Sequence, residues 1–354
     1  MNGTDDLRGW VSAWWRGEAG FSGTVVSALA APLEAIFRLA SRVRNRLYDR
    51  RILEVRSVAV PVVCVGNLTI GGTGKTPVSA WVAGSLRRDG RSPCMLLRGY
   101  GEDEVQVHRE LNPDVPLAVG GDRGERAAEA VAAGADCLVL DDGFQHRALH
   151  RDLDIVLLAA EQWDGRHHLL PRGPWRESVS ALRRADFVLV TRKSASLSEG
   201  ERVVAAVRHI TPELPCGLVH LALADFLPLE AGGRVAIPGK GDTVTAVTTL
   251  GNPVAFEEQL RGTGAVVEPL RFPDHHDFSN DDVQAIMQRS ARTTIVMTRK
   301  EAVKLRGRLP SEAHALIADQ KLIFDQGEQE LEDVIRRAAS AQRPSGRTRG
   351  SLGE

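Results

Sequence analysis

A glycine-rich segment directly after a short apolar run carries the strongest chemical signal in the sequence. The apolar run, Val62–Val65, is typical of a buried parallel strand. Glycine lets several backbone N–H groups point into one hollow, and a helix expected from about Pro77 adds the favourable field of its N-terminus. Lys75 would then reach the outer phosphates of a nucleotide, and Thr76 would ligate Mg²⁺. The residues expected to hold the nucleotide are Gly71, Gly72, Thr73, Gly74, Lys75 and Thr76.

The phosphate-loop pattern is incomplete at Thr69, where the standard spacing has a glycine. A plain glycine-rich turn between a strand and a helix is the alternative. That alternative gives no reason for a Lys75-Thr76 pair at this point of the chain, so we favour the phosphate site.

Two adjacent carboxylates follow another apolar run, Cys137–Leu140. Asp141 and Asp142 end this predicted strand in the way of the second nucleotide-binding motif, where a carboxylate holds Mg²⁺ directly or through water. An Asp-Gly turn in which Asp141 merely caps the strand is the alternative. Gln145 and His146 lie just beyond and are expected to face the same pocket.

Two more polar clusters lie elsewhere in the chain. The segment Arg98–Glu104 reads RGYGEDE, and its acids form a solvated loop unless one of them serves as the base for an acceptor hydroxyl. The segment Phe272–Phe278 reads FPDHHDF. Asp274, His275 and His276 could bind a metal, but a histidine paired with a carboxylate across a domain boundary is at least as consistent with so short a cluster.

The elements that must position these groups alternate between strand and helix from Val60 onward. Helical patterns are expected at Val78–Arg88 and Arg123–Ala133, so the fold class is α/β, a P-loop NTPase-like parallel sheet with ligands at the strand ends. A second, smaller α/β domain is expected after a β linker. The strands expected after Val62–Val65 are Pro93–Leu97, Val115–Val119, Cys137–Leu140, Ile155–Leu158, Phe187–Val190, Gly217–Leu223, Arg234–Ile237, Ala246–Leu250, Val266–Leu270, Thr294–Met297 and His314–Ala318.

The N-terminal segment has an apolar helical face next to an arginine cluster. Between Arg38 and Arg51 there are six arginines and one acid, Asp49. Glu34 and Arg38 interrupt the apolar run, which we expect to be too short for a membrane span. The pattern fits a helix on an anionic membrane surface and, equally, a helix packed on its own domain or on a partner. The apolar positions are Val26, Leu29, Leu33, Ile36, Ala40, Val43 and Leu47.

Length and composition suit a soluble two-domain protein. The 354 residues are expected to divide into an N-terminal helical segment (1–57), a P-loop domain (58–212), a linker (213–243), a C-terminal α/β domain (244–339) and a disordered tail (340–354). A net charge of −1 excludes a globally basic nucleic-acid binder. The four cysteines are scattered without a CxxC pair and are expected to be buried free thiols.

Several phrases occur in the order seen in the tetraacyldisaccharide 4'-kinases, the lipid A 4'-kinase family, which the chain therefore resembles from about Leu33 to Leu305. The phrases are GNLTIGGTGKTP, LRGYG, DDGFQH with RDLDIVLL, LLPRGPWRE, TLGNP, FPDHHDF and MTRKEAVK. The resemblance implies ATP and Mg²⁺ as cofactors. It also implies transfer of the γ-phosphate to the 4'-hydroxyl of a tetraacyldisaccharide 1-phosphate, which gives the bis-phosphorylated lipid A precursor. A monomeric, peripheral protein on the cytoplasmic face of the inner membrane is expected.

The resemblance also implies roles for single residues. Lys75 and Thr76 match the phosphate-loop lysine and the Mg²⁺ threonine, and Asp141 and Asp142 match the paired metal-binding acids. The residues implied at the acceptor substrate are Arg98, Gln145, His146, Arg176 and Glu177.

The family's catalytic aspartate, which pairs with a histidine, usually lies in a GDEP phrase. Asp103 is the match here, although Glu102 and Val105 replace the glycine and the proline, and His275 matches the histidine. Asp103, oriented by His275, would accept the proton of the sugar hydroxyl as the domains close. The MTRKEAVK phrase departs from the family at Arg299 and Glu301, so we assign it no catalytic role. The catalytic residues implied are Asp103, His275, Lys75 and Asp142.

Two other classes of protein remain possible from the sequence alone. A P-loop GTPase or ATPase of assembly or metal delivery would hydrolyse nucleotide without a lipid acceptor, but the chain lacks an NKxD-like base-reading motif. A non-enzymatic membrane-surface adaptor would not turn nucleotide over at all.

Overall fold

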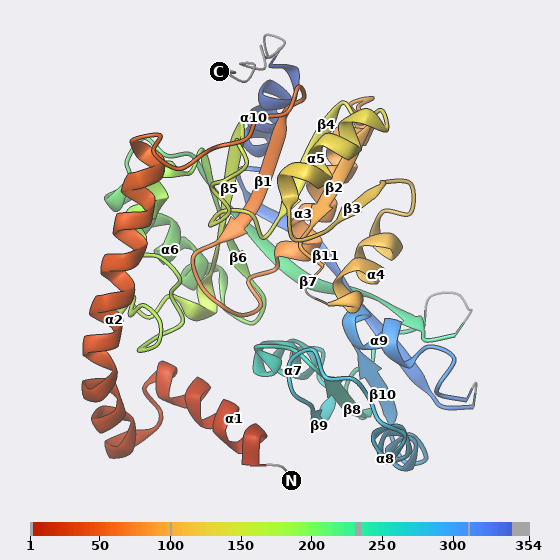
Figure 1. The fold of residues 1–354 in the computed structure, drawn as a ribbon. Helices are drawn as coiled ribbons and strands as arrows, with labels where there is room; N and C mark the ends of the chain where they lie inside the picture. The colour runs from red at the N-terminus through yellow and green to blue at the C-terminus, as the bar shows by residue number, and fades with distance from the viewer. Residues whose placement is uncertain (1–2, 100, 231–234, 311, 342–354) are drawn as a thin grey trace.

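All strands in the described part of the chain join one eleven-stranded sheet, in the order β3-β2-β4-β1-β5-β6-β7-β11-β10-β8-β9 (Figure 1). The computed structural model describes residues 3–99, 101–230, 235–310 and 312–341, with side chains from residue 9 onward. The strands are β1 (Val62–Asn67), β2 (Pro93–Leu97), β3 (Leu117–Val119), β4 (Cys137–Asp141), β5 (Leu153–Ala159), β6 (Phe187–Arg192), β7 (Cys216–Pro228), β8 (Thr243–Thr248), β9 (Val266–Arg271), β10 (Thr294–Met297) and β11 (Ala315–Gln326).

The parallel half of the sheet has β1 at its centre and contains the strands β3, β2, β4, β1, β5, β6 and β7, in that order. Helices cover both of its faces. Alternate β1 side chains point to opposite faces. Val63 and Val65 share one core with α3 and α10, whereas Val62 and Cys64 share another core with α5. The helices of this half are α3 (Lys75–Arg88), α4 (Glu102–Leu111), α5 (Arg123–Ala132), α6 (Leu197–Ile210) and α10 (Glu328–Ser340), with the 3₁₀ turns η1 (Ala160–Gln162) and η2 (Val179–Arg184).

A long antiparallel pair, β7 with β11, connects this half to a smaller one. The smaller half contains the parallel strands β8, β9 and β10 and the helices α7 (Pro253–Gly262), α8 (Asn280–Ser290) and α9 (Arg299–Leu305). In Figure 1 it lies below the parallel half, with α9 near α4. The expected fold class, a P-loop NTPase-like sheet with a smaller α/β part joined by β structure, is confirmed.

Several expected boundaries differ from the observed ones. The acidic segment taken as a loop forms α4, and α3 begins at Lys75 rather than Pro77. The short expected linker strand is the thirteen-residue β7, because it pairs along its length with β11 as well as β6. Of the expected strand at 234–237, Val235 makes only an isolated bridge to Phe226, and residue 234 lies outside the described residues. The expected disordered tail lies outside them from residue 342 onward.

Helix α2 (Gly20–Asp49) packs along the outside of the parallel half, and α1 (Gly3–Arg16) precedes it (Figure 1). One face of α2 is tied to the body through Glu34, whose buried carboxylate accepts hydrogen bonds from Arg38, Arg172 and the Leu169 N–H. The opposite face is apolar and exposed. Its side chains are Phe21, Val25, Leu29, Leu33, Ile36, Leu39 and Val43.

By length and composition α2 is long and apolar enough to cross a bilayer. The expectation that its apolar run is too short for a span was therefore wrong on composition. The interrupting charges are Glu34 and Arg38, and they neutralise each other as an i,i+4 ion pair on the body-facing side. All four cysteines are buried free thiols, as expected.

Candidate active site

The phosphate loop lies at the carboxyl end of the central strand β1 and leads into α3. Gly74 adopts a φ of +87°, and a Cβ at this position would lie 2.3 Å from Leu221 Cδ1, so only glycine fits. The loop conformation is fixed by hydrogen bonds. Asn67 Nδ2 donates to Thr73 Oγ1 at 2.8 Å, Thr191 Oγ1 donates to the Thr73 carbonyl at 2.9 Å, and Lys193 Nζ donates to the carbonyl that precedes Thr73 at 2.9 Å.

Asp142 lies between two cations beside this loop. Its Oδ1 is 3.6 Å from Lys75 Nζ and 2.8 Å from Arg176 Nη2, and Arg176 Nη1 donates to Oδ2 at 3.2 Å. Burial alone would raise the pKa of Asp142, but the charge of Lys75 and the hydrogen bond and charge of Arg176 hold it well below its usual range. Asp142 also has a φ of +48°, an uncommon backbone conformation outside glycine. The carboxylate is thus held ionised where nucleotide phosphates would arrive.

Asp141, at the end of β4, is buried and surrounded by donors. Its Oδ1 accepts from Ser79 Oγ at 2.8 Å and from the Asp142 N–H at 3.0 Å, and its Oδ2 is 3.1 Å from His108 Nε2. Burial would raise its pKa, but the hydrogen bond and charge of His108, and the charge of Lys75, lower it. His108 lies on α4 and was not singled out in the sequence.

The donor set near the loop suits Mg²⁺. Thr76 lies in the first turn of α3, which follows β1, and Asp141 and Asp142 lie at the carboxyl end of β4, the strand beside β1. One hydroxyl and two carboxylates therefore belong to the same edge of the sheet. Hard oxygen ligands are those that Mg²⁺ prefers, and it commonly uses one or two carboxylates together with phosphates and water. No group of three or more His, Cys, Asp or Glu side chains able to hold a metal occurs among the described residues.

Asp103 and His275 meet, although they are far apart in sequence. Asp103 lies in the first turn of α4, and His275 follows β9 in the smaller half. His275 Nδ1 lies 3.2 and 3.3 Å from the two carboxylate oxygens of Asp103, and Lys304 Nζ lies 3.2 Å from Oδ2. Asp103 is only 3% exposed.

The charges around this pair set its protonation. Burial would raise the pKa of Asp103, but the hydrogen bond from His275 and the charges of Lys300 and Lys304 hold it well below its usual range. The same hydrogen bond raises the pKa of His275 above 6.5. The neighbouring Glu104 behaves in the opposite way, because burial and the charge of Asp141 raise its pKa.

The second histidine of the FPDHHDF segment has a separate partner. His276 Nε2 lies 2.9 Å from Asp282 Oδ2, and its ring stacks on Phe272. Asp274 pairs with Lys300 at 2.6 Å. Of the two interpretations left open by the sequence, the geometry matches the histidine–carboxylate pair, because each histidine has a carboxylate partner of its own.

The smaller half also reaches the phosphate loop directly. A Cβ on Gly251, in the turn after β8, would lie 3.5 Å from the Gly71 Cα and 3.4 Å from Asp274 Oδ2. The two halves therefore meet at the point where the loop, the carboxylates and the Asp103–His275 pair lie close together.

Most of the residues expected at the acceptor are held by contacts near the end of β1, and Arg98 is exposed. Gln145 Nε2 donates to the Asn67 carbonyl, and burial with nearby arginine charges lowers the pKa of His146 to about 4, so His146 is neutral at pH 7. Arg176 holds Asp142, as described above. Glu177 is buried and accepts from Asn45, Gln145 and Arg184. Arg98 is exposed just after β2 at the same edge of the sheet.

Within the MTRKEAVK phrase, Lys304 contacts Asp103 and Lys300 contacts Asp274, whereas the two residues that depart from the family make structural contacts. Arg299 bridges Glu110 on α4 and Asp319 on β11. Glu301 is fully buried, caps α9 and accepts from the Thr249 N–H and hydroxyl.

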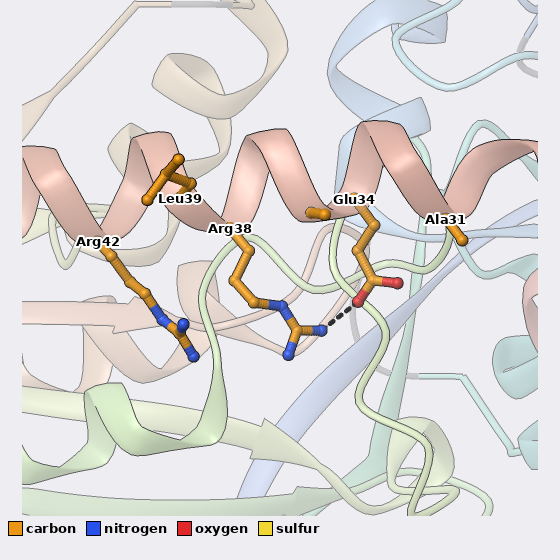
Figure 2. Close-up of a pocket in the computed structure, with 6 residues that line it drawn as sticks. Ala31, Glu34, Arg38, Leu39 and Arg42 are labelled. Carbon is orange, nitrogen blue, oxygen red and sulfur yellow. Dashed lines mark hydrogen bonds and ion pairs between the residues drawn. The ribbon is translucent and has the colours of Figure 1, made fainter.

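Helix α2 connects the surface of the molecule to the acceptor residues. Arg44 donates to the Gln145 carbonyl at 2.6 Å, and Asn45 donates to Glu177 at 2.7 Å. An open hollow of about 350 Å³ lies beside this helix. In Figure 2, Arg38 and Arg42 point to the same side of α2, and Arg38 pairs with Glu34. The hollow is lined by Ala31, Glu34, Ala35, Arg38, Leu39 and Arg42.

Comparison with known proteins agrees with this arrangement. A tetraacyldisaccharide 4'-kinase from Anaeromyxobacter dehalogenans (strain 2CP-C) is 39% identical over 329 residues, which cover 84% of this chain and 86% of the relative. One from Nitrosococcus oceani is 33% identical over 296 residues, or 78% of this chain and 81% of the relative. The crystal structure of an LpxK from Aquifex aeolicus in complex with ATP shares the fold, with a TM-score of 0.67 and 24% identity over 89% of this chain and 99% of that chain. A family model described as Tetraacyldisaccharide-1-P 4'-kinase matches residues 26–114 and 101–340, and the chain belongs to that family.

Proposed function

We propose that this protein transfers the γ-phosphate of ATP to the 4'-hydroxyl of a tetraacyldisaccharide 1-phosphate. Family membership supports the reaction, and the relatives named above carry this activity in their names. The observation that carries the proposal is the Asp103–His275 pair at the meeting point of the two halves, beside a phosphate loop. A hydrolase that uses water needs no such acceptor-side pair, so the arrangement favours a kinase over a P-loop GTPase or ATPase without a lipid acceptor.

The phosphate loop and its neighbours would bind and orient the nucleotide. The loop amides and the N-terminus of α3 attract phosphate oxygens, and Lys75 supplies a positive charge at the outer phosphates. Thr76, Asp141 and Asp142 would hold Mg²⁺, which neutralises charge on the transferred phosphoryl group when bound. Arg176 keeps Asp142 ionised and fixed in place.

Asp103 would accept the proton of the sugar hydroxyl. Its low pKa makes it a weak base, but a loose phosphoryl-transfer transition state builds up little charge on the attacking oxygen, so orientation and late proton acceptance suffice. His275 orients the carboxylate, and Lys304 adds a second contact to it. The turn at Gly251 packs on the phosphate loop and helps to exclude competing water.

The lipid would reach this site from the membrane surface along α2. The exposed apolar side of α2 suits the acyl-chain region of a bilayer, and the exposed Arg42 on the same helix suits anionic headgroups. Glu34 ties the opposite side of the helix to the body, which supports a helix that lies on a membrane surface rather than across the bilayer. We propose the cytoplasmic face of the inner membrane as that surface. Gln145, His146, Glu177, Arg98 and Arg176 would contact or position the disaccharide, and a monomer is sufficient for this geometry.

A turnover assay with and without lipid tests the proposal. Purified protein with Mg-ATP should form phosphorylated lipid when the disaccharide 1-phosphate is present, with ADP in equal amount. Equal ADP release with and without lipid would favour the hydrolase. Absence of turnover under both conditions would favour a non-enzymatic membrane adaptor.

A further inference from the structure

His108 is a fully buried histidine that lies against the carboxylate at the end of β4. Its exposed fraction is 0%, and its Nε2 lies 3.1 Å from Asp141 Oδ2. Its other ring nitrogen, Nδ1, is buried without a hydrogen-bond partner among the described residues. A buried imidazole with one satisfied nitrogen directs its single hydrogen bond at Asp141, so the contact fixes that carboxylate rather than a wider network.

The donors around Asp141 leave little freedom to the side chain. A carboxylate has about four acceptor positions, and three are taken by Ser79, the Asp142 N–H and His108. The first two donors hold Oδ1, and His108 is the donor on Oδ2. Without His108, Oδ2 has lost its donor and the carboxylate can rotate about its bond to Cβ.

Helix α4, which carries His108, is gripped at both ends by the smaller half. At its N-terminal end, Asp103 contacts His275 and Lys304. At its C-terminal end, Glu110 pairs with Arg299 at 3.2 Å and also with Arg306. His108 lies between these two ends, so the helix that these contacts hold against the smaller half also holds the carboxylate at the end of β4.

We propose that His108 is a positioning residue for the metal carboxylate Asp141 and that it makes α4 the link through which docking of the smaller half sets the metal site. This inference rests on the proposed metal role of Asp141. The hydrogen bond from His108 sets the position of Asp141 Oδ2, and the packing of α4 sets the position of His108. Docking of Glu110 onto α9 therefore improves the geometry of the metal ligand as well as that of Asp103.

Binding of Mn²⁺, as a paramagnetic substitute for Mg²⁺, to the full-length protein with a non-hydrolysable ATP analogue tests the proposal without any turnover. Replacing groups that orient metal ligands typically weakens metal binding ten- to hundredfold. We expect His108→Leu to weaken Mn²⁺ binding by about tenfold or more on this basis. Binding of ADP in EDTA, which depends on Lys75 and the loop amides, should stay within about twofold, since the loop is intact. His108→Gln, which keeps a donor, should restore most of the affinity.

Val107→Ala is the matched control, because Val107 is buried on the same helix and its apolar side chain cannot donate a hydrogen bond to a carboxylate. It should lower thermal stability and leave Mn²⁺ affinity near that of the wild type. An equal loss of stability in His108→Leu with unchanged Mn²⁺ affinity would overturn the proposal and leave His108 a packing residue. If His108→Leu does not fold, His108→Asn, whose amide is too short to reach Asp141, takes its place and the same two outcomes decide.

Two further variants distinguish the metal role of Asp141 from the link through α4. Asp141→Asn should itself weaken Mn²⁺ binding, and if it does not, the proposed metal role fails rather than the role of His108. Glu110→Gln alone should weaken Mn²⁺ binding. Combined with His108→Leu, which already lacks the hydrogen-bond donor to Asp141, it should have no added effect. Full additivity of the two changes, or no effect of Glu110→Gln, overturns the link through α4.

Discussion

Loss of the Asp103–His275 pair should slow phosphoryl transfer while ATP binding survives. Asp103 lies 3.2 Å from both His275 Nδ1 and Lys304 Nζ, and it is buried, so no water can take over its place without rearrangement. Positioned acid–base groups contribute about a hundredfold or more, and a hundredfold corresponds to about 2.7 kcal/mol in the activation free energy. Asp103→Ala and His275→Ala should each cost about this much in single-turnover phosphorylation of the lipid.

The double variant tells whether the two residues act as one unit. Independent residues would multiply to about ten thousandfold, or roughly 5.4 kcal/mol, whereas a single unit can be lost only once and leaves the double variant near the worse single variant. Asp103→Asn should match Asp103→Ala, because the amide keeps the shape but cannot take the proton.

His276→Gln is the matched control, since the His276 side chain pairs with Asp282 rather than with Asp103. Strictly multiplicative effects, or an active Asp103→Asn protein, would refute the reasoning. The next acid to examine would be Glu104, whose pKa is raised by burial and by the charge of Asp141.

Three other outcomes follow from the same geometry. Lys75→Ala should abolish lipid phosphorylation with an unchanged circular-dichroism melt, because Lys75 is partly exposed and its measured contact is the 3.6 Å approach to Asp142; near-normal turnover would contradict this. The rate should fall as the pH drops through the pKa of His275, which the hydrogen bond to Asp103 raises above its usual value, since a protonated His275 makes Asp103 a weaker base; a pH profile of His275→Gln that retains this limb would argue against it. Ile36→Glu, on the exposed apolar face of α2, should abolish flotation with anionic liposomes, whereas Thr24→Glu, exposed on another side of the helix, should float as the wild type does. Equal flotation of both variants would count against a membrane-surface role.

The nucleotide side of the molecule could be predicted closely from sequence. An apolar run followed by glycines, Lys75 and Thr76 predicts a strand, a loop and a helix, and the structure has β1, the phosphate loop and α3 in that order. The apolar run before Asp141 predicts the strand β4 for the same reason, namely the continuous burial of parallel strands, and the structure places this strand beside β1. These features depend on neighbouring residues, so a local pattern is enough to reveal them.

The acceptor side of the site was harder to predict from sequence, because it depends on contacts between segments that are far apart in the chain. The acids at 102–104 were read as a loop, although a glycine followed by three acids also suits the first turn of a helix. Had that helix been expected, His108 would have stood one turn beyond Glu104 on the same side. Its contact with Asp141 still depends on how α4 packs beside β4, which no local pattern states.

The interrupting charges of the N-terminal helix illustrate the same limit. Glu34 was read as a break in an apolar run, yet it is buried against Arg172 and the Leu169 N–H, more than a hundred residues away. The long strand β7 likewise pairs with β11, which lies far along the chain beyond the smaller half. A local pattern does not reveal this partner, so only a short linker strand was expected.

The position of the transferred phosphate tests the central claim most directly. Wild-type protein, Mg-ATP and tetraacyldisaccharide 1-phosphate should give one product, with a second phosphate whose ³¹P–¹H coupling places it on the 4'-oxygen. The 4'-deoxy analogue should give no phosphorylated lipid, and Lys75→Ala should give none with either lipid. A phosphate at another hydroxyl, or a phosphorylated product from the 4'-deoxy lipid, would contradict the account.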